Sequence, residues 1–223
     1  MSENKTIKKI PVRTLVVYSV LFYGAWSIVH FFIDPVITAE CSEVMSTFLI
    51  NGVIKNLIWT LPALLLIRKY KDSMYVGLKE MFTPDKKCVK YLWVFPAMAA
   101  YIILAVVIHG GKITIQESFG ISDIIVVLFV GITEELVFRG WLLNSTVNMG
   151  ENKALAINAA MFLLIHFPKW ICDGVFVSNI TSFSFVSIIA LSVIFGLLFL
   201  RTKNILIPVA AHMMWDLLLF MLY

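Results

Sequence analysis

The sequence predicts an all-α fold, a polytopic bundle of about seven transmembrane helices, within a range of about six to eight. The first observation is composition: of 223 residues, 60% are hydrophobic and only 14% are charged. A soluble domain of this length could not bury so much apolar surface. The second observation is that several windows reach the roughly 20 apolar residues that a helix needs to cross a bilayer core. We therefore expect residues 1–223 to form a single integral membrane domain.

Polar breaks such as "NMGENK" divide the apolar sequence into spans. The first span is too long for a secretory signal and has no small-residue cleavage site, so we expect it to remain in the mature protein. Each of the others is bounded by charged or turn-forming residues. In chain order, the predicted spans are Thr14–Ile33, Val44–Ile67, Tyr91–His109, Asp123–Leu143, Ala154–Phe167, Phe183–Leu200 and Ile205–Tyr223.

Lysine and arginine are distributed unevenly between the predicted loops. Residues 68–90 contain six lysines and one arginine, residues 34–43 contain neither, and four basic residues precede the first span, namely Lys5, Lys8, Lys9 and Arg13. By the positive-inside rule, the amino terminus is cytoplasmic and the carboxyl terminus lies outside. The net charge of +4 fits contact with a lipid bilayer and indicates no nucleic-acid partner. The compartment we expect is a bacterial cell membrane.

The segment "GITEELVFRG", residues 131–140, carries three ionisable groups inside a predicted span. Each charge near the bilayer centre costs about 2.5–3.5 kcal/mol on insertion scales, so such residues usually have a partner or a function. Glu135 and Arg139 are four residues apart and can pair on one helix face, whereas Glu134 points about 100° away. Glu134 thus has no partner in its own helix and is a candidate general base. The alternative is a purely structural ion-pair network.

Three further polar residues lie in two other predicted spans, His166 in one and His212 and Asp216 in the other. A lone histidine on an apolar helix is usually a satisfied core residue. At about 1.5 Å per residue, however, both histidines reach the depth of Glu134 near the bilayer midplane. Such a layer suits a catalytic site. A proton-coupled transporter is a rival interpretation, but the sequence has no inverted repeat or broken helix.

The same residues carry a resemblance to a known family. "EELVFRG" resembles the EExxxR signature of the CPBP intramembrane proteases, which include CAAX prenyl endopeptidases and bacterial bacteriocin-processing or self-immunity proteins of the Abi type. "FLLIH" is similar to the family's FxxxH motif, and "FGLLFLRTKNILIPVAAHMMWD" resembles its last block, which ends in HxxxN. The resemblance covers residues 120–220 as a CPBP-like protease core. Residues 1–119 form amino-terminal helices with no assigned motif.

The resemblance implies a role for each polar residue of this core. Glu134 and His166 would activate a water that attacks a peptide carbonyl, with Glu135 and Arg139 as a supporting pair. His212 and the residue four positions later would stabilise the oxyanion. The implied substrate is a peptide or membrane protein, as in bacteriocin processing and self-immunity. A non-catalytic immunity or scaffold protein with the same motifs is the alternative.

Asp216 departs from the family pattern, because asparagine is frequent at this position. An ionised aspartate accepts hydrogen bonds but cannot donate one to an oxyanion. Asp216 is therefore expected to orient His212, to act as a protonated donor, or to bind a metal.

The cofactor also stays open at this stage. A divalent metal such as Zn²⁺ could use His166, His212, Glu134 and Asp216 and keep an open position for water. A metal-free mechanism with Glu134 as base would use the same residues, and it is the one we favour.

Two expectations concern residues without a place in these motifs. Lys55 lies at the centre of the second span, too deep to reach the interface easily. It is expected either to take part in the site, by pairing with a carboxylate or lining an access path, or to make a local structural contact. Gly131, Gly140 and Gly196 are expected to permit close approach between helices.

Overall fold

The structure, a computed structural model, describes residues 9–223 apart from the side chain of Lys87, and these residues form helices and turns with no strand. Lys5 and Lys8, which support the predicted orientation of the amino terminus, lie outside the described residues. Five helical segments are long and apolar enough to cross a membrane: Val12–Glu40, Glu43–Lys69, Cys88–Ile108, Glu151–Cys172 and Ser184–Thr202. A shorter apolar helix, α13, spans Leu206–Leu222. The prediction of an all-α membrane bundle is confirmed.

The first two long segments contain π-helical turns. The first consists of α1 (Val12–Ile28), η1 (Val29–Ile33) and α2 (Asp34–Glu40). The second consists of α3 (Glu43–Thr47), η2 (Phe48–Ile54), η3 (Asn56–Thr60) and α4 (Leu61–Lys69). Ser42 caps α3, since its hydroxyl accepts a hydrogen bond from the Met45 backbone N–H at 3.4 Å.

The prediction that the first span ends at Ile33 is too short, because the helix continues to Glu40. Proline removes a backbone N–H and its ring clashes with the preceding turn, which normally kinks a helix. Here the wide turns of η1 and η3 immediately precede Pro35 and Pro62. A π turn relieves this clash, because its hydrogen bonds run from residue i to i+5. Both helices therefore pass through their prolines.

The fourth predicted span is one continuous helix that carries Glu134, Glu135 and Arg139. It begins with α7 (Ile121–Glu135), continues through the π-helical η6 (Leu136–Leu143) and ends in α8 (Asn144–Thr146). At its start, Asp123 accepts a hydrogen bond from the Gly120 N–H at 2.9 Å. This segment is too rich in charge to rank among the apolar spans, because it holds Glu134, Glu135 and Arg139.

The remaining elements complete the bundle. The longer helices are α6 (Val94–Ile108), α9 (Glu151–Leu164) and α12 (Ser184–Thr202). The shorter ones are α5 (Leu78–Met81), α10 (His166–Cys172), α11 (Phe176–Thr181), and the 3₁₀ turns η4 (Lys71–Ser73), η5 (Lys86–Tyr91) and η7 (Val147–Met149).

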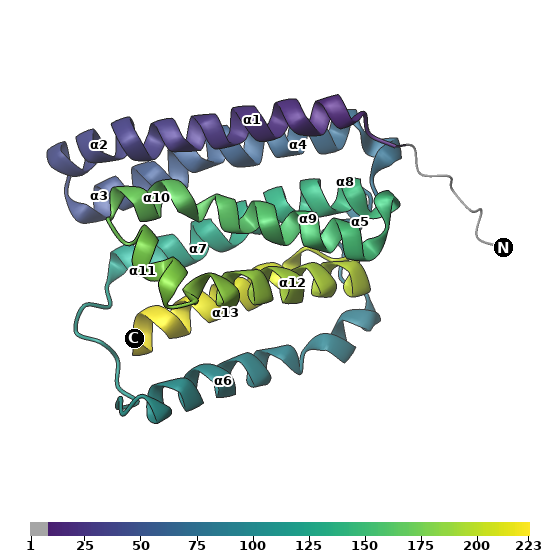
Figure 1. Cartoon of the computed structure of the whole chain (residues 1–223). Coiled ribbons are helices and arrows are strands. Elements are labelled where there is room, and N and C mark those ends of the chain that lie inside the picture. The colour runs from purple at the N-terminus through teal and green to yellow at the C-terminus, as the bar shows by residue number, and fades with distance from the viewer. Residues whose placement is uncertain (1–8) are drawn as a thin grey trace.

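Figure 1 shows α7 in the interior of the bundle, with α1 and α4 along one edge and α6 along the other. Helix α13 packs against α7, and α12 packs against α9. A side chain at Gly131 would place its Cβ 2.6 Å from the Met213 Cγ, and one at Gly196 would place it 2.7 Å from the Leu155 Cδ2. These two glycines permit the close approach of α7 to α13 and of α12 to α9. At Gly140 the nearest atom belongs to Leu136 of the same helix.

The outer surface of the bundle is apolar. Large hydrophobic side chains such as Val20, Phe32 and Ile108 are exposed by 66–70%, which would be unfavourable in water but is normal against lipid tails. The protein is therefore an integral membrane protein. The start of α1, the end of α4 and α5 lie at one end of the bundle, and the turn between α2 and α3 lies at the other (Figure 1). That the basic end is cytoplasmic stays a prediction.

Candidate active site

The two adjacent glutamates end α7, and the arginine follows within the π turn η6. Glu134 is 6% exposed, whereas Glu135 and Arg139 are fully buried. The Arg139 Nη1 donates a hydrogen bond to the Glu135 Oε1 at 2.9 Å. The predicted pair between Glu135 and Arg139 is thus confirmed, and it neutralises two charges where no water can reach them.

The other arm of Arg139 extends this pair into a network that the sequence did not indicate. The Arg139 Nη2 donates to the backbone oxygen and to the hydroxyl of Ser192, both at 3.1 Å. The Ser192 hydroxyl donates to the Asn158 Oδ1 at 3.4 Å, and the Asn158 Nδ2 donates to the Phe138 carbonyl at 2.6 Å. The sequence offered one indication that Asn158 belongs to the site. It lies four residues before Phe162, the first residue of the FxxxH motif, and therefore on the same helix face.

His212 connects this network to α13. Its Nδ1 lies 2.8 Å from the Glu135 Oε1, and its Nε2 lies 3.4 Å from the Asp216 Oδ2. An ionised carboxylate only accepts hydrogen bonds, so both ring nitrogens must donate if both carboxylates are ionised. His212 is then an imidazolium between two anions. Of the three roles expected for Asp216, this geometry favours the orientation of His212.

Glu134 has no partner in its own helix, as the sequence indicated, but it has one from the second helical segment. The Lys55 Nζ donates to the Glu134 Oε1 at 2.7 Å, and Lys55 itself is 3% exposed. Of the two expectations for Lys55, pairing with a carboxylate of the site is confirmed.

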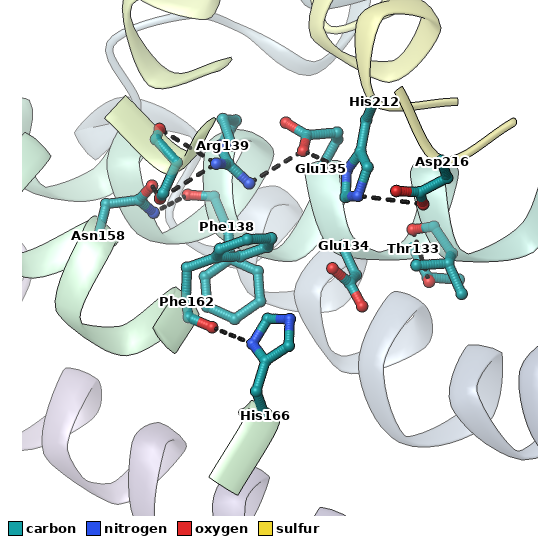
Figure 2. Close-up of polar contacts among 12 residues, drawn as sticks. Thr133, Glu134, Glu135, Phe138, Arg139, Asn158, Phe162, His166, His212 and Asp216 are labelled. Carbon is teal, nitrogen blue, oxygen red and sulfur yellow. Dashed lines mark hydrogen bonds and ion pairs between the residues drawn. The ribbon is translucent and has the colours of Figure 1, made fainter. Parts of the chain in front are cut away.

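His166 begins α10, just after α9 ends. Its Nδ1 lies 2.9 Å from the Phe162 carbonyl oxygen. A carbonyl can only accept, so Nδ1 carries the proton, and in the neutral ring Nε2 is left as the acceptor. The Phe162 ring lies between the two histidines, with its centroid 5.4 Å from that of His166 and 6.1 Å from that of His212. Figure 2 shows the Glu134 carboxylate in the gap between His166 and the pair His212 and Asp216.

A cavity of about 400 Å³ leads to this gap. Glu134, Lys55 and His166 lie in its inner wall, and its outer part reaches Thr38 and Glu43, on either side of the turn between α2 and α3. Its size is within the range of small-molecule sites, so it can hold a water and part of a peptide. The structure thus brings Glu134, Lys55 and His166 together at one cavity. The other predicted site residues, Glu135, Arg139, His212 and Asp216, do not line it.

The arrangement does not fit the zinc shell considered from the sequence. Within residues 9–223, no three side chains of histidine, cysteine, aspartate or glutamate converge in a way that could hold a metal ion. Both nitrogens of His212 face carboxylates, and the ammonium of Lys55 occupies the Glu134 Oε1.

The comparison with protein families adds an independent finding. Residues 116–218 match the family model described as type II CAAX prenyl endopeptidase, Rce1-like. The matched segment contains every site residue predicted from the motifs, but it does not contain Lys55. No curated protein and no solved structure matches the chain.

Proposed function

We propose that the protein, whose residues 116–218 match the Rce1-like family model, is an intramembrane endopeptidase of the CPBP family in which Glu134 and His166 activate the attacking water. The observation that carries the proposal is the meeting of these two residues, from separate helices, at the inner wall of one cavity. A general base must lie within hydrogen-bond reach of the water that it deprotonates. A cavity between the two side chains provides that position.

The reaction begins with a water held between Glu134 and His166. The free oxygen of the Glu134 carboxylate takes one proton, the water oxygen bonds to the peptide carbonyl carbon, and the carbonyl π electrons move to the oxygen. His166 accepts a hydrogen bond from the same water through its Nε2, because its Nδ1 donates to the Phe162 carbonyl. Glu134 then gives the proton to the leaving amine as the C–N bond breaks.

The negative charge of the tetrahedral intermediate needs a positive environment. His212 lies on the other side of Glu134 from His166 (Figure 2). As an imidazolium it contributes a positive charge beside the intermediate. Its contact with Asp216 is the longer of its two, at 3.4 Å against 2.8 Å to Glu135. We expect Nε2 to exchange Asp216 for the oxyanion, while Glu135 and Arg139 hold the ring in place.

The outer part of the cavity defines the side from which a substrate arrives. It reaches the turn between α2 and α3, where Glu43 and Thr38 are exposed. If the basic end of the bundle is cytoplasmic, this turn lies on the outer side of the membrane. The proposed substrate is therefore a peptide or membrane-protein segment presented there, such as a secreted leader or bacteriocin peptide in processing or self-immunity.

Reconstitution in proteoliposomes tests this function directly. The purified protein is incubated with a mixture of short peptides, and new termini are detected by mass spectrometry. Glu134→Gln should lower kcat by a factor on the order of 10²–10⁴, the usual contribution of general acid–base catalysis. His166→Gln should also lose activity, which keeps the test informative if Glu134→Gln fails to fold.

Glu151→Gln is the matched control, because this carboxylate pairs with Arg201 on the surface, far from the cavity. It should cleave as the wild type does. Full activity in a folded Glu134→Gln protein would remove Glu134 from the mechanism and favour the structural interpretation of its ion pair. A wild type that cleaves no peptide in the mixture would favour the non-catalytic immunity or scaffold protein.

A further inference from the structure

Lys55 is a buried cation in the middle of a membrane-crossing segment. It stands between the π turns η2 and η3 of Glu43–Lys69 and is 3% exposed. A lysine near the bilayer centre is unfavourable without a partner. Its partner is Glu134, whose Oε1 lies 2.7 Å from the ammonium although the two residues are 79 positions apart in the chain.

Two tryptophans fix the position of this ammonium. The Lys55 Nζ lies 4.4 Å from the ring centroid of Trp59 and 5.5 Å from that of Trp26, within reach of cation–π attraction. Trp59 is fully buried, and its ring packs against Phe22 and Phe138. The ammonium is thus held by one carboxylate and two aromatic faces at the inner wall of the cavity.

This contact determines the state of Glu134. A buried carboxylate without a partner takes up a proton rather than keep its charge, and a protonated Glu134 cannot deprotonate water. Lys55 stabilises the ionised form and occupies one oxygen, which leaves the other oxygen for the water. As the proton moves to Glu134, the negative charge moves to the oxyanion in the same cavity. The ammonium then remains as the counter-charge of the new anion.

We propose that Lys55 is a positioning residue of the peptidase, which keeps Glu134 ionised and directs its free oxygen to the water. This inference rests on the proposed function. It also gives a role to the amino-terminal half of the chain, since the other polar residues of the site all lie within residues 116–218. The segment that matches the family would then hold an incomplete site.

The first test compares three substitutions by steady-state kinetics in proteoliposomes. Lys55→Met should lower kcat by a factor on the order of 10² and change KM little, because the ammonium acts on Glu134. Lys55→Arg keeps the charge and should restore much of kcat. Lys203→Met is the matched control, because Lys203 also has its ammonium over an aromatic ring, that of Tyr75 at 5.0 Å, but does not line the cavity. Its kcat should stay close to that of the wild type.

Infrared spectroscopy provides a readout that does not depend on turnover. The carbonyl band of a protonated carboxylic acid should appear in Lys55→Met and be absent in wild type, in Lys55→Arg and in Lys55→Met/Glu134→Gln. If Lys55→Met does not fold, Lys55→Gln replaces it, since its amide is uncharged but can still hydrogen-bond to Glu134.

The two readouts separate failure of this inference from failure of the proposed function. Wild-type kcat in Lys55→Met, or the absence of the acid band, would overturn the role of Lys55 while leaving the peptidase intact. An inactive wild type combined with the acid band in Lys55→Met would instead overturn the peptidase. It would still support Lys55 as the group that keeps Glu134 ionised.

Discussion

Glu134 and Glu135 are neighbours in the chain, yet they belong to two different regions of the bundle. Glu135 lies in a sealed cluster with Arg139 and Ser192, away from the cavity, and His212 connects this cluster to the cavity side. Glu134 lies in the cavity wall with Lys55, where a water can reach it. The same residue type is therefore fixed and inaccessible in one region, but accessible in the other. The sealed cluster is suited to stability, and the cavity is suited to chemistry.

The largest effect on stability is expected where the sealed cluster is broken. Arg139→Met leaves the buried carboxylate of Glu135 with His212 as its remaining partner, and removing one member of a buried pair costs about 3–5 kcal/mol. Glu135→Gln/Arg139→Met should be less destabilised than the sum of the single variants. Unfolding in detergent, followed by circular dichroism, measures this difference. Simple additivity would mean that the two residues do not act as a pair.

A smaller effect is expected where α7 and α13 touch. Gly131→Ala places a methyl group 2.6 Å from the Met213 Cγ, and overpacking of this kind costs about 1–3 kcal/mol. The displacement of α13 would also weaken the contact between His212 and Glu135. Gly24→Ala, on a surface where no atom lies within 4 Å of the new Cβ, is the control. Equal thermal stability of the two variants would show that the approach of α13 is not tight.

Substitutions of Asp216, at the boundary between the two regions, can show whether its negative charge or its contact with His212 is what matters. Asp216→Ala removes the partner of the His212 Nε2, and an unsatisfied buried donor costs about 1–3 kcal/mol. Asp216→Asn keeps an acceptor and also gains a donor for the oxyanion, so it should be better tolerated in both stability and kcat. Equal loss of kcat in the two variants would indicate that the negative charge of Asp216 is required.

The smallest effect is expected from metal removal. Lys55 holds one oxygen of Glu134, and both ring nitrogens of His212 face carboxylates. Because Glu134 and His166 are proposed to act without a metal, exhaustive chelation should leave kcat of the reconstituted protein nearly unchanged. Loss of activity on chelation and recovery with added zinc would contradict this expectation. One zinc per chain after purification, together with an inactive and metal-depleted Asp216→Asn, would decide for a metal site instead.

Contacts that are local in sequence could be predicted, and contacts between distant helices mostly could not. The pair Glu135 and Arg139 follows from a spacing of four residues on one helix. The partner of Glu134 is 79 residues away, so the sequence indicated only that Lys55 needed some partner. Ser192 gave no signal, because a single serine in an apolar helix usually bonds to its own backbone.

The fold, too, could be predicted in part and not in full. Apolar length was sufficient to predict the helical spans, since the bilayer core sets the length of a crossing helix. The continuation of the first helix beyond Ile33 could not be predicted, because proline normally interrupts a helix. The π turn that relieves the strain before Pro35 has no pattern that apolar periodicity can reveal.

The wide turns on both sides of Lys55 change how this helical segment responds to the loss of a residue. A π turn holds one residue more than an α-helical turn. If one residue were deleted between Phe48 and Ile54 and the helix closed into regular α geometry, the extra residue of the wide turn would be the one lost, and the parts on either side would keep nearly the same facing. In a regular stretch such as α4, the same deletion would rotate the part that follows by about 100° and shift it by about 1.5 Å. A single-residue deletion should therefore be tolerated better in η2 than in α4.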